Sequence, residues 1–176
     1  FEVFADELSD MLAQAKVIGS WGSNVYVKIP VTNTKGKFTG PIIRELSATG
    51  LKLNITAVFT LKQVRSIAEN LFLDTPAIIS VFAGRIADTG LDPLPLMRKS
   101  VEILNDLPKA ELLWASPREL LNIIQADEVC CHIITATPDI LGKLKFLGKD
   151  QDEFSLETVQ MFYNDAQSAQ YTINIK

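Results

Sequence analysis

The chain has 176 residues, of which 47% are hydrophobic and 22% charged, a balance that fits a single globular domain with its own core. Its net charge of −4 offers no broad basic surface, which argues against nucleic acid and anionic membranes as partners. Two adjacent cysteines and one histidine exclude a disulfide framework and a structural zinc site. We therefore expect a reducing, cytoplasmic location. No apolar run approaches the roughly 18 residues of a membrane span.

Short β-branched runs alternate with amphipathic helical stretches along the whole chain, which predicts βα units and a parallel sheet. The predicted strands cover residues 1–5, 25–29, 53–59, 77–82, 111–115 and 129–136. Most are apolar on both faces, as parallel strands covered by helices must be. We therefore read the chain as an α/β protein.

Between these strands, helical periodicity and local end signals predict the helices. Residues 8–18 place their apolar side chains on one face, and Pro41 and Gly50 suit the two ends of a second helix. Thr60 with Gln63 has the form of a capping box. A loop over residues 83–93 then leads to a helix over 94–104.

The C-terminal third continues the same rhythm. Ser116, Pro117 and Glu119 have the form of another capping box, and Thr137 opens a helix through residue 144. A last helix covers residues 154–169, and its period predicts that Leu156, Val159, Phe162 and Ala166 point inward.

Lys28 stands in the middle of a run that is otherwise fit for a buried strand. One interpretation is an edge strand whose lysine extends to water. The other is a lysine that serves as a nucleophile toward a carbonyl carbon. Neighbouring strands also carry polar groups: Asn54 and Thr56 share one face, and Ser80 lies on the next strand.

Four stretches resemble the transaldolase family: VYVKIPVT at 25–32, LNITA at 53–57, SVFAGRI at 80–86 and WASPR at 114–118. They occur in the family's order and cover nearly the whole chain. The resemblance implies a (β/α)8 TIM barrel of the transaldolase type, of which this chain carries about six βα units plus the C-terminal helix, as one incomplete barrel domain over residues 1–176. It also implies sugar phosphates as substrates, the pentose phosphate pathway, no cofactor and a homo-oligomer.

In this resemblance Lys28 forms a Schiff base with a ketose phosphate, and the iminium serves as the electron sink for carbon–carbon cleavage. Glu2 handles protons through a water molecule that Thr56 helps to hold. The remaining implied residues are Asn54 and Ser80 for substrate hydroxyls, and Arg85, Ser116 and Arg118 for the substrate phosphate.

Each of these residues also has a structural interpretation. Ser116 fits an N-cap, and Arg85 and Arg118 fit ordinary surface charges. Asn54 fits a buried hydrogen-bond network as well as a substrate contact. Adjacent Cys130 and Cys131 cannot converge on one metal ion from a strand, so we interpret them as small buried residues.

Phe82 bears on the choice within the family. The related fructose-6-phosphate aldolases resemble this pattern but carry a tyrosine at that position, a glutamine where Glu2 stands, and no asparagine at the position of Asn54. A phenyl ring cannot protonate or orient a water, so the bound enamine is expected to wait for an aldehyde acceptor. The structural interpretation of Phe82 is core packing.

The sequence also departs from the family. Two opening strands, ending in Asp-Thr and Thr-Thr-Asn-Pro, have no counterpart, and that aspartate is the base that the resemblance implies for cleavage. We therefore expect a longer functional polypeptide, or a fragment whose open edges are covered. Three hypotheses follow: a transaldolase that transfers a dihydroxyacetone unit, an aldolase-like lyase that releases it, and a non-catalytic barrel fragment.

Overall fold

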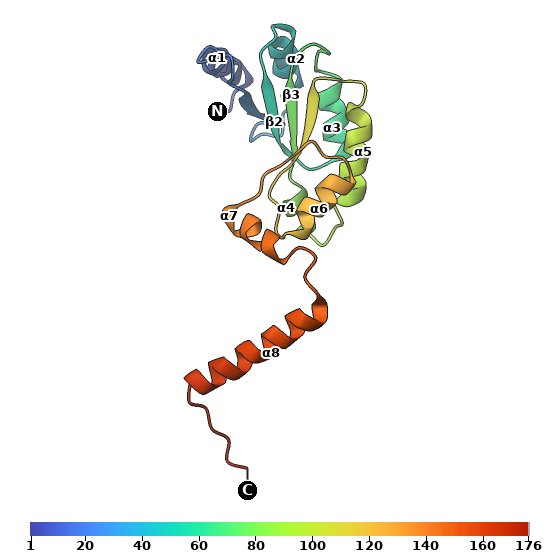
Figure 1. The fold of residues 1–176 in the computed structure, drawn as a ribbon. Helices are drawn as coiled ribbons and strands as arrows, with labels where there is room; N and C mark the ends of the chain where they lie inside the picture. The colour runs from blue at the N-terminus through green and yellow to red at the C-terminus, as the bar shows by residue number, and fades with distance from the viewer. Residues whose placement is uncertain (176) are drawn as a thin grey trace.

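The computed structural model describes residues 1–175 and contains a five-stranded parallel sheet in the order β1-β2-β3-β4-β5 (Figure 1). The strands are β1 (Val27–Pro30), β2 (Leu53–Val58), β3 (Ala77–Val81), β4 (Ala110–Trp114) and β5 (Ile133–Ile134). Each strand pairs with the next one along the chain, which is the arrangement of successive βα units in a barrel wall. The sheet is therefore an arc of a β/α barrel, and the predicted fold class is confirmed.

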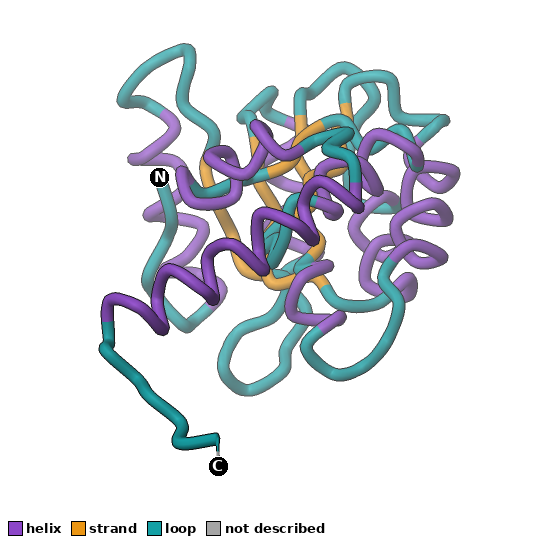
Figure 2. The backbone as a smooth tube through the Cα atoms, turned by 60° about the horizontal axis from the view of Figure 1, so that its bottom comes forward, coloured by secondary structure: helices purple, strands orange, loops and turns teal. Residues whose placement is uncertain are grey.

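Helices alternate with the strands along the chain, and those before α8 lie around the sheet (Figure 2). They are α1 (Leu8–Gly19), α2 (Gly40–Ala48), α3 (Leu61–Ala68), α4 (Ala83–Ala87), α5 (Leu94–Leu104), α6 (Leu121–Glu128), α7 (Pro138–Leu141), the 3₁₀ helix η1 (Gly142–Phe146) and α8 (Gln151–Ser168). No helix within residues 1–175 combines the length and the apolar character that crossing a membrane requires.

Successive side chains of each strand point to opposite faces of the sheet, and one of these faces forms the apolar core. Val27, Ile29, Leu53 and Ile55 are fully buried in one hydrophobic cluster with side chains of the covering helices. The intervening residues, such as Lys28 on β1, project to the opposite face because successive strand residues alternate. In a barrel, that opposite face is the interior.

Several predicted helix ends are confirmed. The Thr60 hydroxyl accepts a hydrogen bond from the Gln63 amide, and the Gln63 side-chain oxygen accepts one from the Thr60 amide, which completes the capping box. Pro41 lies in the first turn of α2, and Gly50, just beyond that helix, has a left-handed φ of +79°. Helix α5 covers the predicted residues 94–104.

The predicted first and last strands are much shorter than the sequence suggests. Residues 1–5 pair with β1 only through a one-residue bridge between Glu2 and Lys28. The predicted strand over 129–136 shrinks to Ile133–Ile134, because the Val129 amide still bonds to Gln125 at the end of α6 and Cys130 then turns the chain with φ +56°.

Two local predictions around the β3 and β4 ends are wrong. The stretch predicted as the loop 83–93 begins with α4, which starts directly after Phe82. Ser116 is not a helix cap, because it has a left-handed φ of +58° and α6 begins only at Leu121. Instead, the Asn122 side chain accepts hydrogen bonds from the amides of Arg118 and Glu119 and fixes the turn before α6.

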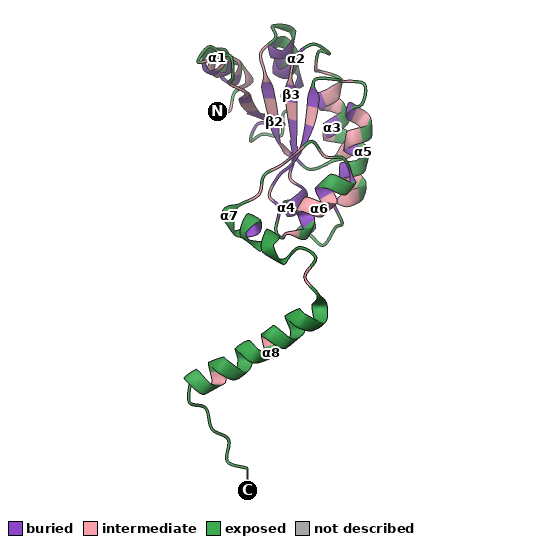
Figure 3. Cartoon of the chain, in the orientation of Figure 1, coloured by how far each residue is buried: buried purple, intermediate pink, exposed green. Residues whose placement is uncertain are grey.

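The C-terminal segment also differs from its prediction. The helix expected over 137–144 divides into α7 and the 3₁₀ helix η1. The last helix forms as α8, but it extends away from the sheet and is exposed along its length (Figures 1 and 3). The inward orientation predicted for Leu156, Val159 and Phe162 is therefore wrong, because each is more than half exposed. Ala166, the fourth residue of that prediction, is only partly buried.

Candidate active site at the strand ends

Lys28 and Glu2 form an ion pair on the barrel-interior side of the sheet. The Lys28 amide donates to the Phe1 carbonyl at 2.7 Å, and the Val3 amide donates to the Lys28 carbonyl at 3.0 Å. These two bonds set Glu2 beside Lys28, and the Lys28 Nζ lies 3.3 Å from Glu2 Oε2. The Lys28 side chain is 37% exposed, so a small molecule can reach the amine.

Strand β2 places two polar residues beside this pair. The parallel register sets Asn54 opposite Lys28 and Thr56 opposite Pro30. The Ser80 hydroxyl on β3 donates to Asn54 Oδ1 at 2.7 Å. Asn54 therefore belongs to a hydrogen-bonded network with Ser80, as one of its two predicted interpretations expects.

Thr56 is the least satisfied polar group of the site. Its hydroxyl is buried and has no hydrogen-bond partner within the described residues 1–175. The pairing of β2 with β3 shifts between Ile55 and Val58, and Ala57 adopts a left-handed φ of +59° at that irregularity. A buried hydroxyl without a partner costs about 1–3 kcal/mol, which a bound water or substrate oxygen would offset.

Lys28 and the polar residues of β2 and β3 line one pocket of about 210 Å³, which Glu2 does not line. Its lining residues are Lys28, Asn54, Thr56, Ser80, Phe82, Leu113, Ala115, Ser116 and Thr135. Larger hollows of about 340, 430, 440 and 570 Å³ also occur, and Lys28 lines none of them. Glu2 lines the hollow of about 440 Å³, beside Phe1 and Trp21. The pocket of about 210 Å³ is the candidate site because it holds the Lys28 amine together with hydroxyl groups.

Three pocket residues were not predicted: Leu113, Ala115 and Thr135. Thr135 directly follows Ile133–Ile134 at the end of β5, the same strand-end position that Ser80 and Ser116 approach on β3 and β4. Its position after a β-branched run is the signal that could have identified it.

Phe82 lines the pocket from the end of β3. Its ring packs against Phe59, with 5.6 Å between the ring centroids, and the Arg85 guanidinium lies 5.0 Å above the ring. Phe82 therefore packs, as its structural interpretation predicts, and faces the pocket as well. Arg85 does not line the pocket but lies behind Phe82.

Arg118 also lies outside the pocket lining. Its Nε donates to Asp88 Oδ1 at 3.0 Å and its Nη2 contacts Asp88 Oδ2, a two-pronged pair on the surface. The Arg118 hydrogen bonds, together with the charges of Arg118 and Arg85, hold the pKa of Asp88 below its usual range against the opposing effect of desolvation. Both predicted phosphate-binding arginines thus come near one aspartate.

Ser116 is placed by a close backbone contact with α4. A Cβ at Gly84 would lie 1.5 Å from the Ser116 carbonyl oxygen, and the Gly84 amide donates to the Ala115 carbonyl at 3.2 Å. Only glycine permits this approach. The contact sets the start of α4, next to Arg85, against the loop that carries Ser116 and Arg118.

The cysteine pair takes no part in this site. Cys130 is exposed, so the prediction that both cysteines are buried is wrong for Cys130, and burial raises the pKa of the Cys131 thiol, which disfavours a reactive thiolate. The Leu112 amide donates to His132 Nδ1 at 3.1 Å. These contacts give Cys131 and His132 a structural role beside β4.

Comparison with known proteins agrees with the geometry. The family model described as Transaldolase/Fructose-6-phosphate aldolase matches residues 1–175. A protein named probable transaldolase 2 from Listeria monocytogenes is 33% identical over 144 residues, which are 81% of this chain and 62% of the relative. A probable transaldolase from Nitrosopumilus maritimus is 30% identical over 145 residues, again 81% of this chain and 62% of the relative.

The chain thus spans a little under two thirds of the length of these curated relatives. The matched part includes a parallel sheet, a strand lysine paired with a glutamate, and hydroxyl-bearing strand ends around one pocket.

Proposed function

The chain belongs to the transaldolase/fructose-6-phosphate aldolase family, and from that premise we propose that it transfers a dihydroxyacetone unit from a ketose phosphate to an aldose phosphate through a Schiff base on Lys28. The observation that carries the proposal is the Lys28–Glu2 pair, 3.3 Å apart, in which Lys28 lines a pocket together with Thr56 and Ser80. The proposal includes a cytoplasmic location and the pentose phosphate pathway, as expected from the sequence.

Formation of the Schiff base needs a neutral amine and a proton carrier. The Lys28 nitrogen forms a bond to the ketose carbonyl carbon and gives up one of its protons, and the carbonyl oxygen takes up a proton to give a neutral carbinolamine. Expulsion of water then requires a second proton on the leaving hydroxyl, and the nitrogen lone pair forms the C=N bond. Glu2 is near enough to Lys28 to exchange these protons, directly or through one water.

Thr56 and the Asn54–Ser80 pair can form hydrogen bonds with the water and the substrate hydroxyls that take part in this step. The unpartnered Thr56 hydroxyl can hold the water that carries the proton or the hydroxyl that leaves. Asn54 and Ser80 already share one hydrogen bond and present further donors and acceptors to substrate hydroxyls. The pocket thus offers a polar contact on each of three neighbouring strands.

Cleavage between the third and fourth substrate carbons leaves the bonding electron pair in an enamine on Lys28. The hydroxyl proton on the fourth carbon must go to a base as the aldehyde leaves, and we assign no residue of this chain to that step. The third hypothesis, a non-catalytic barrel fragment that acts in binding or assembly, predicts no substrate adduct on Lys28. A Schiff base that keeps all six substrate carbons would instead show that the chain forms the adduct but does not complete cleavage.

The two arginines near the pocket can bind the phosphate group of the substrate. Arg118 binds Asp88, and the charge of Arg85 also acts on that carboxylate. Ser116 lines the pocket, and its backbone contacts Gly84, the residue before Arg85. Arg118 still has donors that Asp88 does not use, because the guanidinium group carries five. We propose these three residues as the phosphate contact.

Phe82 favours transfer over release. It contributes a phenyl ring, not a hydroxyl, to the lysine pocket, so the ring cannot deliver a proton to the enamine. The alternative function is an aldolase-like lyase that releases dihydroxyacetone. Product formation from fructose 6-phosphate with and without an aldose phosphate separates the two: transfer requires the acceptor, and equal rates without it would overturn the transferase proposal.

We also propose that α8 packs against a second copy of the chain. None of its residues is buried, and its exposed side chains include Leu156, Val159, Met161 and Phe162. Most of the stability of a helix in a protein comes from packing of its apolar face, so the exposed apolar side chains of α8 need a partner. The chain itself exposes another apolar surface at Phe1 and Trp21. Light scattering after gel filtration tests this proposal: a multimer that becomes monomeric after removal of residues 151–176 supports it, and a monomeric full chain contradicts it.

A further inference from the structure

The segment that carries Glu2 has few bonds to the sheet. Its strand pairing is a single bridge to Lys28, formed by one hydrogen bond on each side, and the Phe1 nitrogen donates to the Tyr26 carbonyl at 3.0 Å. A bridge of this kind alone permits the segment to fray. The position of the Glu2 carboxylate therefore depends on what holds the far end of the segment.

The loop after β1, to which the far end of this segment is attached, is held in place by its own hydrogen bonds. Asn33 is buried, and its Oδ1 accepts hydrogen bonds from the amides of Lys35 at 3.1 Å and Lys37 at 2.9 Å. The Asn33 amide also donates to the Lys37 carbonyl at 3.0 Å, and Gly36 turns the loop with φ +74°. The loop is thus bonded to itself and continuous with the strand of Lys28.

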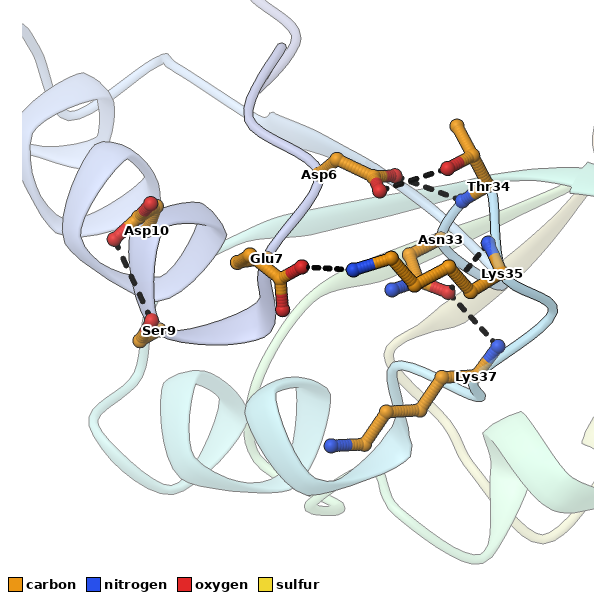
Figure 4. A network of polar contacts seen from close by, with 8 residues as sticks. All are labelled: Asp6, Glu7, Ser9, Asp10, Asn33, Thr34, Lys35 and Lys37. Carbon is orange, nitrogen blue, oxygen red and sulfur yellow. Dashed lines mark hydrogen bonds and ion pairs between the residues drawn. The ribbon is translucent and has the colours of Figure 1, made fainter.

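Asp6 fastens the Glu2 segment to this loop (Figure 4). Its Oδ1 accepts from the Thr34 amide and its Oδ2 accepts from the Thr34 hydroxyl, both at 2.7 Å. The neighbouring Glu7 forms an ion pair with Lys35. Both carboxylate oxygens of Asp6 thus bind Thr34. Two bonds to one residue fix the orientation of the Asp6 side chain as well as its distance from the loop.

A second brace comes from α1. The Gln14 side-chain oxygen accepts from the Phe4 amide at 2.9 Å and from the Ala5 amide at 3.0 Å. The amides of Phe4 and Ala5, which follow the bridge to β1, thus have hydrogen-bond acceptors. The segment between Glu2 and Asp6 is therefore held at both ends against the unit that contains Lys28 and Thr34.

We propose that Asp6, through Thr34, is a positioning residue that keeps the Glu2 carboxylate against Lys28 during proton transfer. Glu2 and Asp6 lie four residues apart on one segment, and Lys28 and Thr34 lie six apart on one strand and loop. Two fixed points prevent the segment from sliding along or swinging away from β1. The inference rests on the proposed function for its catalytic consequence only, since the two-point attachment is a property of the fold.

Amide hydrogen exchange tests the attachment without any substrate. In Asp6→Ala, the amides of Val3 and Lys28 are expected to exchange about 10-fold faster than in the wild-type chain. Asp6→Asn keeps an acceptor for the Thr34 amide and gains a donor for its hydroxyl, so it should restore slow exchange. The matched control is Asp92→Ala, which removes an aspartate that accepts from the Leu94 amide at 2.9 Å, away from this segment.

A double-mutant cycle tests the catalytic consequence. Asp6→Ala should slow single-turnover Schiff-base formation with fructose 6-phosphate by about 10-fold at saturating substrate, with little change in the concentration for half-saturation. In a Glu2→Gln background, the same Asp6→Ala change should have almost no further effect, because the group that it positions is gone. A purely structural defect would lower the rate in both backgrounds alike.

The two readouts separate the possible failures. Unchanged exchange at Val3 and Lys28 in Asp6→Ala overturns the inference, whatever the activity. Additive losses in the cycle overturn the positioning role and leave Asp6 as a structural residue only. If the wild-type chain forms no Schiff base while Asp6→Ala still speeds exchange, the proposed function fails and the attachment of the segment stands.

Discussion

Thr56 and Lys28 line one pocket, but within residues 1–175 the buried Thr56 hydroxyl has no hydrogen-bond partner, whereas the Lys28 amine lies 3.3 Å from Glu2. An unsatisfied buried hydroxyl reduces stability, so its presence here suggests a functional use.

Thr56→Val should stabilise the chain and slow its chemistry. Valine has nearly the same shape and removes the unpaired hydroxyl, so we expect a gain of about 1 kcal/mol in the free energy of unfolding. Loss of the group that holds water should slow Schiff-base formation by about 10-fold or more. Urea unfolding and single-turnover kinetics measure the two effects.

Thr39→Val is the matched control for this change. The buried Thr39 hydroxyl donates to the carbonyls of Pro30 at 2.8 Å and Val31 at 3.0 Å, so the same substitution should here lower the free energy of unfolding by about 1–2 kcal/mol. Equal destabilisation in both variants would show that Thr56 has a structural partner after all.

Phe82→Tyr should move the reaction toward release of the three-carbon unit. The added phenol would enter the lysine pocket, where it can give a proton to the enamine, and acceptor-independent release should rise by about 10-fold. Phe59→Tyr, in the ring that packs on Phe82 outside the pocket lining, is the control and should leave release unchanged. A rise in the control alone would refute the role given to Phe82.

Gly84→Ala should disturb the phosphate side of the site. The new methyl group would meet the Ser116 carbonyl oxygen, so the loop must shift, and we expect a loss of about 2 kcal/mol or more in the free energy of unfolding. The Michaelis constant for the phosphorylated substrate should rise. Gly142→Ala, which meets no atom within 4 Å, should change stability by less than about 0.5 kcal/mol.

Asp88→Asn should lower the stability of the fold near neutral pH and leave it unchanged in strong acid. Because Arg118 holds the pKa of Asp88 below the ordinary value of about 3.9, the folded chain binds this proton more weakly than the unfolded chain. The Asp88 carboxylate therefore stabilises the fold above that ordinary value, and the stabilisation disappears as the pH falls through the lowered pKa. Thermal unfolding from about pH 3 to pH 7 should show a flatter acid limb in the variant. An unchanged acid limb would contradict this account.

Local patterns predicted the elements whose ends depend on neighbours in sequence. The Thr60 capping box and the Pro41 helix start are satisfied within a few residues, and so they follow from the sequence alone. Ser116 has the same local pattern as Thr60, yet Asn122 fixes that turn and Gly84 fixes the position of Ser116. Those long-range contacts leave no trace in the capping pattern.

The strand residues of the site were predictable for the same reason. Period-two alternation places Asn54 and Thr56 on one face, and the parallel register then brings Lys28 beside them. The surroundings of Arg118 were not predictable, because its partner Asp88 lies 30 residues away in sequence. Thr135 was missed because the strand before it forms only Ile133–Ile134.

Helix α8 shows a further limit of periodicity. Its apolar residues predict one face that needs a partner, but the pattern does not say whether that partner belongs to the same chain. The structure leaves this face exposed, which is why we propose a second copy as the partner.

The measurement that tests the central claim most directly is borohydride reduction of the chain in the presence of fructose 6-phosphate, followed by peptide mass spectrometry. We predict a single adduct, on the peptide that contains Lys28, and its absence in Lys28→Met. An adduct with the mass of the three-carbon fragment shows that the chain completes cleavage, whereas one with the mass of the whole sugar phosphate shows binding without cleavage. An unmodified Lys28 in the folded wild-type chain would contradict the account.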